Sequence, residues 1–580
     1  MLRCAPRARR GTVRAVYAAR LIALTSLIAL LGVACAAAFE NRRPIAPLEI
    51  PPRSAPAGQA FHVRADGDDN ADGLTPDTAW ASIDRVNAGS YGPGDRVLFR
   101  GGDTFTGTIH IVPEVATGAP EAPIIFGSYG TGRATLGGGD GAAVQIESVS
   151  GIRIENLRVS GNITTCLFGL EGAHGIHIIN ERGQANAGIT IARVEVSGYC
   201  AGIATIATGV GALTAVKFEE VEAHDNLTAG VLLVASEPDS QGRYSLRDVT
   251  IVDSRFTGSP GVPAPDAGAN ITGGGVFVYR GDRVIVENNV AIDNGGKNGC
   301  AGGGAEGGGN SGIVVYGRDI TIRGNEVARQ RVAMNCPWQG GGIAVGGLRV
   351  LVERNYTHDN DGPAVTLDND SGDATALVRH NVSLNDGALS NSEGALLIVG
   401  GDGGYQFVNN TVRAQRGPLL VAQGSDDRGY PRDIAVANNV FALRDGVFLV
   451  VDPTSVEGIH FLGNLYYDAS SKYLIQWGDQ AYTGIEPWSL ALDQERTGGA
   501  LAAIVADPLF CAEGADTLDH RPFSTLAPAR PRPESSAREA GRPIPPPLIA
   551  GDGREFAGLP VPVGKPDVGA IDQSPSETCG

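Results

Sequence analysis

The sequence has very little lysine and no excess of positive charge. Four lysines stand against 42 arginines, and acidic residues outnumber basic ones, which gives a formal net charge of -18. A negative field of this kind disfavours nucleic acid as a partner, although an acidic polysaccharide can still bind at a local basic patch. Any reaction that needs a lysine base therefore has few candidates.

Several motifs of catalysis and cofactor binding are missing. The chain has no nucleophile elbow, no dinucleotide-binding motif, and no pair of histidines at the spacing by which a helix binds zinc. The glycine-rich stretch 302–309 is not followed by the Lys-Ser or Lys-Thr of a phosphate-binding loop, so we interpret it as permissive loop backbone.

Long apolar stretches are missing as well, except for one near the N-terminus. The first 38 residues carry six arginines and no acid, an apolar stretch over residues 21–33, and then small residues. This pattern predicts a signal peptide over 1–38, too short in its apolar part to span a bilayer, followed by a linker over 39–60. Residues 31–35 are similar to a lipoprotein cleavage box ending at Cys35. We therefore expect a secreted or cell-envelope protein without a transmembrane segment.

The dominant positive feature is a short phrase, apolar-x-apolar-x-x-Asn-x-apolar, that occurs eleven times between Ile152 and Tyr466. Successive copies lie 25 to 37 residues apart, a spacing typical of a solenoid in which each repeat stacks on its neighbours. We expect the asparagines to form an inward column of hydrogen-bonded amides. The sixth position of the phrase holds Leu157, Val194, Val221, Ser254, Asn289, Asn325, Asn355, Asn381, Asn410, Asn439 and Asn464.

A second phrase, a glycine-led alternating strand, precedes most copies of the first, as at 274–279, 311–316 and 341–346. The turns between the two, such as 280–283, are too short for a crossover helix. A coil is thus expected to contain one strand, a turn, the Asn-bearing strand and a return loop, so the sequence predicts an all-β, single-stranded parallel β-helix. We expect one monomeric array, with an N-terminal cap and first coils over 61–143, repeats over 144–480, and an irregular C-terminal cap and tail over 481–580.

An even number of cysteines, six, follows the predicted leader, which favours disulfides in an exported chain. Two pairs of cysteines fall in connections after consecutive copies of the phrase, and equivalent loops on adjacent coils lie close together. Free thiols or a metal site are the alternative. The expected disulfides join Cys166 to Cys200, Cys300 to Cys336 and, from the remainder, Cys511 to Cys579.

Both ends of the mature chain resemble secreted right-handed parallel β-helix proteins. The N-terminal resemblance covers residues 61–73, Trp-Ala-Ser-Ile at 80–83 and Pro-Gly-Asp-Arg-Val-Leu-Phe at 93–99. The C-terminal one covers Asp-Pro-Leu-Phe at 507–510, residues 536–541 and Asp-Val-Gly-Ala at 567–570, with departures at Ser535 and Glu539. This pectin lyase-like superfamily includes polysaccharide lyases, so the resemblance implies a right-handed coil and a carbohydrate-active protein.

Register places candidate binding residues side by side. Tyr279, Tyr316, Gly346 and Asp368 should lie outward on four consecutive coils, and two aromatic rings beside an acid would form a shelf for sugar rings. The longest neighbouring set of return loops lies at 258–273, 292–310 and 328–340, and insertions of this kind often build the binding surface of a solenoid. These loops contain Lys297, Glu306, Arg329, Arg331 and Trp338.

A polysaccharide lyase needs a group that neutralises the uronate carboxylate and a base that removes the neighbouring proton. Under that scheme Asp368 and Asp370 bind calcium, Arg331 meets the carboxylate, and Lys297 or His358 is the base, while Tyr279, Tyr316 and Trp338 bind substrate. The Asp-Asn pairs that begin at 225, 293 and 359 instead look like turns.

Two other functions remain open from the sequence. A glycoside hydrolase would need two facing carboxylates, such as Asp368 with Glu306 or Glu393. A non-catalytic β-helix could bind carbohydrate or build a surface without cleaving anything. A further outward row, Glu287, Arg323, Glu353 and Arg379, is expected to be a ladder of ion pairs.

Overall fold

The computed structural model describes most of the chain beyond the predicted leader. No helix within these residues is both long and apolar enough to cross a membrane. The predicted signal peptide and Cys35 lie outside the described residues. The described residues are 58–166, 172–181, 183–208, 211–262, 272–297, 311–332, 340–369, 374–387, 394–401, 403–424, 429–512, 526–544, 546–547, 549–561, 566–572 and 579.

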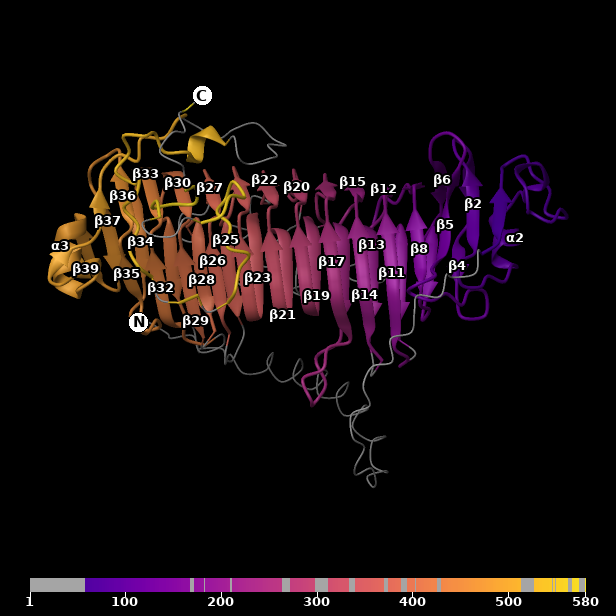
Figure 1. The fold of residues 1–580 in the computed structure, drawn as a ribbon, viewed down its shortest axis with the longest axis horizontal. Coiled ribbons are helices and arrows are strands. Elements are labelled where there is room, and N and C mark those ends of the chain that lie inside the picture. Colours follow the sequence, from indigo (N-terminus) through magenta and orange to yellow (C-terminus); the bar gives the residue numbers. More distant parts are fainter. Residues whose placement is uncertain are drawn as a thin grey trace, which may run out of the picture. The chain divides into compact units, whose positions relative to one another are not determined.

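Two parallel sheets dominate the unit formed by residues 55–580 (Figure 1). The larger sheet contains β1 (Ala60–Val63), β2 (Arg96–Arg100), β4 (Ile109–Ile111), β5 (Ile124–Tyr129), β7 (Val144–Glu147), β8 (Ile152–Glu155), β10 (Ile176–Asn180), β11 (Asn186–Ala192), β13 (Ala201–Ala207), β14 (Leu213–Glu219), β16 (Ala229–Ala235), β17 (Leu246–Val252), β19 (Gly274–Glu287), β21 (Ser311–Arg323), β23 (Gly341–Glu353), β25 (Val365–Asn369), β26 (Ala376–Arg379), β28 (Leu396–Gly400), β29 (Gly404–Val408), β31 (Leu420–Gln423), β32 (Arg432–Ala437), β34 (Val447–Val451), β35 (His460–Leu462), β37 (Leu474–Trp477) and β38 (Gln480–Thr483).

The smaller sheet is built from short strands, one from each coil. It contains β3 (Thr104–Thr106), β6 (Ala134–Gly137), β9 (Leu157–Ser160), β12 (Glu195–Ser197), β15 (Glu222–His224), β18 (Arg255–Thr257), β20 (Val290–Ile292), β22 (Glu326–Ala328), β24 (Tyr356–His358), β27 (Val382–Leu384), β30 (Thr411–Arg416), β33 (Val440–Asp445), β36 (Leu465–Asp468) and β41 (Ile504–Val505). A separate antiparallel pair joins β39 (Arg496–Thr497) to β40 (Ala500–Leu501).

Each complete coil has three strand segments, which corrects the expectation of two. The coil of β25, β26 and β27 shows them separately: the first two lie in the larger sheet and the third in the smaller one. In β19, β21 and β23 the first turn is so tight that the first two segments form one long strand. The third segment was overlooked because it lies within the final positions of the repeated phrase, directly after the asparagine.

The core lies between the sheets and is lined by alternate strand residues. In β19, Val276, Val278, Val284 and Val286 have no exposed surface, and the same inward positions are apolar in the coils on either side. Burial of one such side chain stabilises the fold by roughly 1.5–3 kcal/mol. The period-two alternation therefore determines which face of each strand is inward, and the outward positions are left for function.

The predicted column of asparagines is present at the turn between the two sheets. In each step the Oδ1 of one asparagine accepts hydrogen bonds from the backbone N and Nδ2 of the asparagine one coil earlier, as between Asn325 and Asn289 at 2.9 and 3.0 Å. The Nδ2 of Asn325 also donates to the carbonyl of Val286. The column runs without interruption from Asn289 to Asn464, and every member is buried.

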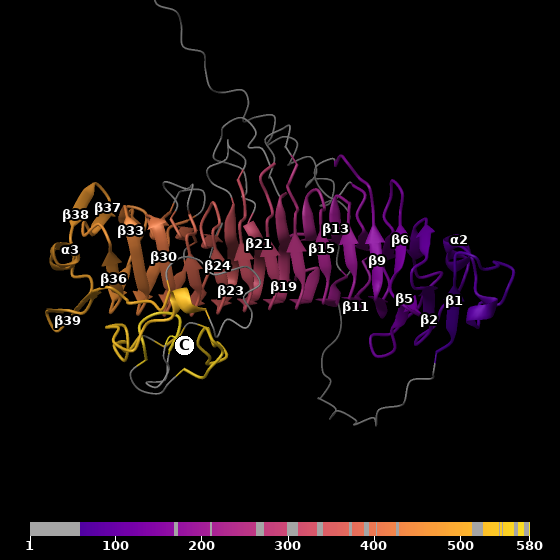
Figure 2. The same ribbon diagram turned by 90° about the horizontal axis from the view of Figure 1, so that it is seen from above.

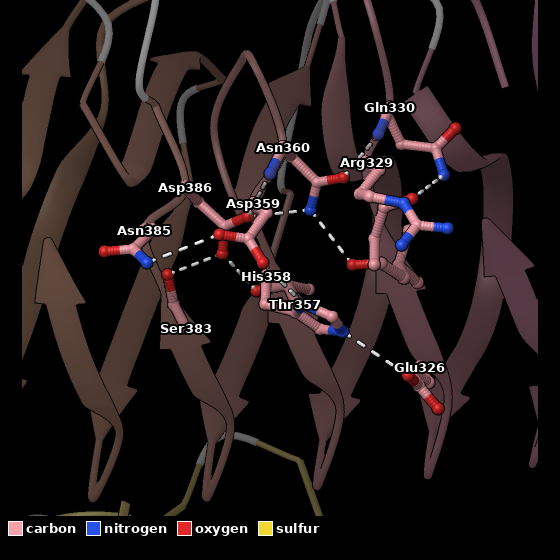
Figure 3. A network of polar contacts seen from close by, with 12 residues as sticks. Glu326, Arg329, Gln330, Thr357, His358, Asp359, Asn360, Ser383, Asn385 and Asp386 are labelled. Carbon is pink, nitrogen blue, oxygen red and sulfur yellow. Dashed lines mark hydrogen bonds and ion pairs between the residues drawn. The ribbon is translucent and has the colours of Figure 1, made fainter. Parts of the chain in front are cut away.

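A second column of buried polar side chains follows the smaller sheet (Figure 3). The backbone N of Gln330 donates to Oδ1 of Asn360, and the backbone N and Nδ2 of Asn360 donate to Oδ1 of Asp386. Asn226 and Asn294 make the equivalent bonds on earlier coils. This column explains the repeated Asp-Asn pairs. The aspartates at 225, 293 and 359 adopt a positive φ, as expected for a turn, whereas the following asparagines point inward.

Short helices and a hairpin lie at the two ends of the coil stack. α2 (Ile83–Asn87) contacts β4 near the first coils, and α3 (Ile485–Leu492) lies beside the antiparallel pair of β37 and β38 near the last ones (Figure 1). The short η1 (Pro76–Thr78) and η4 (Ala527–Ala529) are 3-10 turns. Two expected disulfides, Cys166–Cys200 and Cys511–Cys579, are present, while Cys300 and Cys336 lie outside the described residues.

The C-terminal segment, defined as residues 526–572, runs along the side of the coils instead of closing their end (Figures 1 and 2). Asn438 exchanges hydrogen bonds with the backbone of Arg542, and Arg354, several coils earlier, pairs with Asp552. Leu526, Phe556 and Ile571 form an apolar cluster with outward residues of β24 and β27. The predicted cap over 481–580 thus comprises two parts, an end structure that includes α3 and a segment that covers the smaller sheet.

Candidate functional site

The structure brings Tyr279, Tyr316 and Asp368 together on the outer face of the larger sheet. Tyr279 and Tyr316 are register partners on β19 and β21, and their rings stack with centroids 5.6 Å apart and planes inclined by 22°. The Tyr316 hydroxyl donates to Oδ2 of Asp368 at 3.2 Å, across the strand that carries Gly346. We call Tyr279, Tyr316, Gly346 and Asp368 the tyrosine row.

Gly346 allows Tyr316 and Asp368, on the strands to either side, to approach each other. A side-chain Cβ at this glycine would lie 1.9 Å from the carbonyl oxygen of Asp368 and 3.0 Å from Cδ1 of Tyr316. The absence of that carbon leaves room for the phenol of Tyr316 to reach the carboxylate of Asp368. Burial, with a further contribution from the charge of Asp368, raises the pKa of Tyr279.

The row continues on earlier coils through apolar residues that the sequence analysis did not include. Val234 on β16 is the register partner of Tyr279, and Ile206 on β13 is the partner of Val234; both are partly exposed. Phe277, two residues earlier on the same face of β19, stacks with Tyr279 at a distance of 6.4 Å between ring centroids. The alternation in 201–207 and 229–235 would have placed Ile206 and Val234 in the same outward row. They were not predicted as binding residues because neither is aromatic.

The described residues supply only one carboxylate for the calcium site expected here. Asp370 lies outside the described residues, and Asn369 uses its amide oxygen to accept from the backbone N of Gly347 while its Nδ2 donates to the hydroxyl of Tyr405. The part of the chain that the structure describes contains no group of three or more metal-ligating His, Cys, Asp or Glu side chains. These residues by themselves do not make up a calcium site, and we derive no step through calcium.

Lys297 and Arg331 lie on adjacent return segments. Gly295 and Arg331 form a parallel bridge, and the backbone N of Gly296 donates to the carbonyl of Arg331. Lys297 is exposed, and Arg331 is 45% exposed while its Nη1 contacts Oδ1 of Asp361 at 2.8 Å. The register therefore places Lys297 and Arg331 on neighbouring coils, and both side chains are exposed to solvent. Trp338, Glu306 and Glu393 lie outside the described residues.

His358 occupies a position that does not suit the role of base. Its side chain is 1% exposed, stacks on Tyr356, and contacts Asp359 at 3.0 Å and Glu326 at 3.3 Å (Figure 3). Burial opposes its charge, but the hydrogen bonds to Asp359 and Glu326 prevail and raise the pKa of His358 to about 9. A buried imidazolium with carboxylate partners is a poor acceptor for a substrate proton at neutral pH, so the geometry favours Lys297 over His358 as the candidate base.

The outward row of alternating charges is a ladder of ion pairs, as predicted. Nε of Arg323 lies 2.9 Å from Oε1 of Glu287, and Nη2 of Arg379 lies 2.8 Å from Oε2 of Glu353. Since both guanidinium groups are occupied by these carboxylates, the row stabilises the stacking of coils and does not contribute to the candidate site.

Comparison with known proteins identifies the architecture. The sequence model described as "Right handed beta helix region" matches residues 138–441. The comparison with curated proteins found no match.

Several solved structures match the chain at low sequence identity. The GH136 lacto-N-biosidase from Eubacterium ramulus is 17% identical, with 70% of this chain and 68% of that chain covered and a TM-score of 0.48. The complex of XylC with xylose is 11% identical, with coverages of 89% and 98% and a TM-score of 0.48. Pectate lyase Pel9A is 13% identical, with coverages of 90% and 98% and a TM-score of 0.39.

Proposed function

The chain belongs to the right-handed β-helix family, and on this premise we propose that it binds an acidic polysaccharide along the tyrosine row and cleaves it by β-elimination. The observation that carries the proposal is the contact of Tyr316 with both Tyr279 and Asp368. Two stacked rings offer an apolar platform for sugar faces, and a carboxylate beside them can accept hydrogen bonds from sugar hydroxyls. Because neighbouring coils repeat at roughly 4.8 Å, the row is suited to an extended chain.

The reaction needs a base and a partner for the uronate carboxylate. In this proposal Lys297 removes the proton from the carbon next to the carboxylate, and the released electron pair forms a carbon-carbon double bond. The bond to the glycosidic oxygen breaks, and the leaving oxygen takes up a proton from water. Arg331, whose side chain is 45% exposed, meets the substrate carboxylate. Calcium held by Asp368 and Asp370 remains an expectation that the assay below tests.

Export to the cell exterior or envelope is part of the same proposal. The disulfides Cys166–Cys200 and Cys511–Cys579 are compatible with an oxidising compartment, where a secreted polysaccharide-degrading protein would meet its substrate.

The test is an assay of pectate, alginate and glycosaminoglycans, each with calcium or with a chelator, followed by the absorbance of unsaturated uronate. We expect one substrate to yield product. Lys297→Ala should abolish it, whereas Lys472→Ala, which removes another exposed lysine, should leave it unchanged. Product formation by Lys297→Ala at the parent rate would remove the assigned base.

The two other functions give different results in the same experiment. A hydrolase would release reducing ends without the absorbance change, because its reaction adds water and forms no double bond. A non-catalytic protein would produce neither signal but would still be retarded by polysaccharide in a gel. Either result would overturn the proposed elimination.

A further inference from the structure

A cavity lies on the outer face of the smaller sheet, away from the tyrosine row. It has a volume of about 230 Å³ and is formed where β30, β33 and β36 meet residues 507–510. The strands β30, β33 and β36 follow one another in the smaller sheet (Figure 1), whereas the tyrosine row lies on the larger sheet. The cavity therefore belongs to a different face and to later coils.

The hollow arises from a small residue between two large ones. Arg413, Ala442 and Tyr467 are successive register partners on the three strands, so they form one outward row. The methyl group of Ala442 leaves a notch between the guanidinium of Arg413 and the phenol of Tyr467. The ring of Phe510 closes one side of it.

The guanidinium of Arg413 is held in place by the chain around it. Its Nη1 donates to the carbonyl oxygens of Ala512 at 3.0 Å and Pro528 at 3.4 Å, and its guanidinium carbon lies 5.3 Å from the centroid of the Phe510 ring. A group fixed by two carbonyls and a ring loses little freedom when it meets a ligand, which favours binding.

Arg444 provides a second positive charge at the rim. It is exposed, and its Nη1 donates to Oε1 of Gln415 at 3.3 Å, which is a neutral partner. Among the described residues that line the cavity, Asp507 is the one acidic side chain. In a chain with a net charge of -18, two arginines at one hollow form a local site for an anion.

We propose that this cavity binds a single acidic sugar residue, with Arg444 on its carboxylate and its ring against Tyr467 and Phe510. Pockets for drug-sized ligands measure roughly 300–1,000 Å³, so a hollow of about 230 Å³ suits a ligand the size of one sugar ring. Arginine recognises carboxylates through paired donors, and aromatic faces accept the apolar side of a sugar. The choice of a uronate rests on the proposed function, and the site would hold the polysaccharide at a second point outside the tyrosine row.

The test measures binding of glucuronate and galacturonate by ligand-observed NMR and calorimetry, with glucose and galactose as neutral counterparts. We expect the acids to bind and the neutral sugars to bind at least about tenfold more weakly. Arg444→Ala should weaken binding of the acids by about tenfold or more. Arg416→Ala, on β30 and exposed but outside the cavity lining, should change it less than about twofold, since it alters the net charge equally.

A second variant keeps both arginines and fills the notch. Ala442→Leu should abolish binding of the acids while the circular dichroism spectrum stays that of the parent. Parent-like binding by Arg444→Ala, or equal binding of neutral and acidic sugars, would overturn the site.

The outcome is separable from that of the elimination reaction. The uronate binding that Arg444→Ala removes should remain in Tyr316→Ala, because the two sites lie on different sheets, whereas any uronate binding at the tyrosine row should be lost in that variant. A protein that binds uronates here but forms no unsaturated product would contradict the lyase and support the cavity. An active lyase whose Arg444→Ala and Ala442→Leu variants bind uronates as the parent does would contradict the cavity alone.

Discussion

The carboxylate of Glu495 takes the position that the next asparagine would occupy after Asn464. Its Oε1 accepts from Nδ2 of Asn464 at 2.6 Å and from the backbone N of Asn464 at 3.3 Å, and it also accepts the hydroxyl of Tyr466. Asp386 ends the second column in the same way, since its Oδ1 accepts both donors of Asn360. Both columns of amides thus end on a buried carboxylate.

Glu495 should make stability depend on pH. Burial raises the pKa of Glu495 from 4.5 to about 7, against the opposing hydrogen bonds from Asn464 and Tyr466. Because the folded pKa is the higher one, the stabilising contribution is complete below about pH 4.5 and is lost as the pH rises through 7. Urea unfolding should show the free energy of unfolding falling between pH 5 and pH 8, and falling less in Glu495→Gln. Glu486→Gln, an exposed change on α3, should retain the parent slope; an unchanged slope in Glu495→Gln would contradict the assignment.

His358 should act on stability and not on catalysis. Replacement by glutamine removes the imidazolium that contacts Glu326, whose side chain has no exposed surface, at a cost of about 3 kcal/mol in the free energy of unfolding near pH 7. The pKa of His358 is raised to about 9, so its contribution is complete below about pH 6.5 and disappears as the pH passes 9. Chemical denaturation at pH 7 and pH 10 should therefore show a smaller difference between variant and parent at the higher pH. A folded His358→Gln protein that has lost all activity would restore the histidine as a base.

Tyr316 allows stacking to be separated from its hydrogen bond. Tyr316→Phe keeps the ring beside Tyr279 but removes the hydroxyl that donates to Asp368, so we expect substrate binding within about twofold of the parent and turnover reduced about tenfold. Tyr316→Ala should also weaken binding, by about tenfold, since an aromatic contact is lost. Gel retardation measures the first quantity and initial rates measure the second. Equal loss of binding in both variants would show that the hydroxyl, and not the ring, holds the substrate.

The Cys511–Cys579 disulfide should secure the C-terminal segment. It closes a separation of 68 residues, for which the loss of unfolded-state entropy amounts to about 4 kcal/mol. The double variant Cys511→Ala, Cys579→Ala should unfold at a lower urea concentration than the parent. Its hydrogen exchange should be faster than in the parent, and this increase should be larger in residues 526–572 than in the core strands. Cys166→Ala with Cys200→Ala serves as the matched control, because it removes a disulfide and should leave exchange in the C-terminal segment as in the parent.

Much of the coil could be predicted from the sequence because its causes are local. Inward and outward positions alternate along each strand, and the asparagine at a fixed place in the phrase bonds to its equivalents one coil away, as Asn410 does to Asn439. The same register predicted that Tyr279 would lie beside Tyr316 and that Cys166 would meet Cys200. The second column could have been predicted from the Asp-Asn pairs. In each pair the aspartate forms a turn and the asparagine points inward, but the sequence pattern was interpreted as a turn alone.

The amino-acid sequence by itself determined the winding of the chain, the content of its core and the order of residues along each outward row, because each follows from a period that neighbouring coils share. The tertiary structure alone decided which outward faces are accessible. Asp552 contacts Arg354 across 198 residues of sequence, and the C-terminal segment to which it belongs packs on Tyr356, which stacks against the buried His358. That segment has no repeat of its own, so its docking depends on the shape and apolar surface of the finished coils, which no pattern within a single repeat contains.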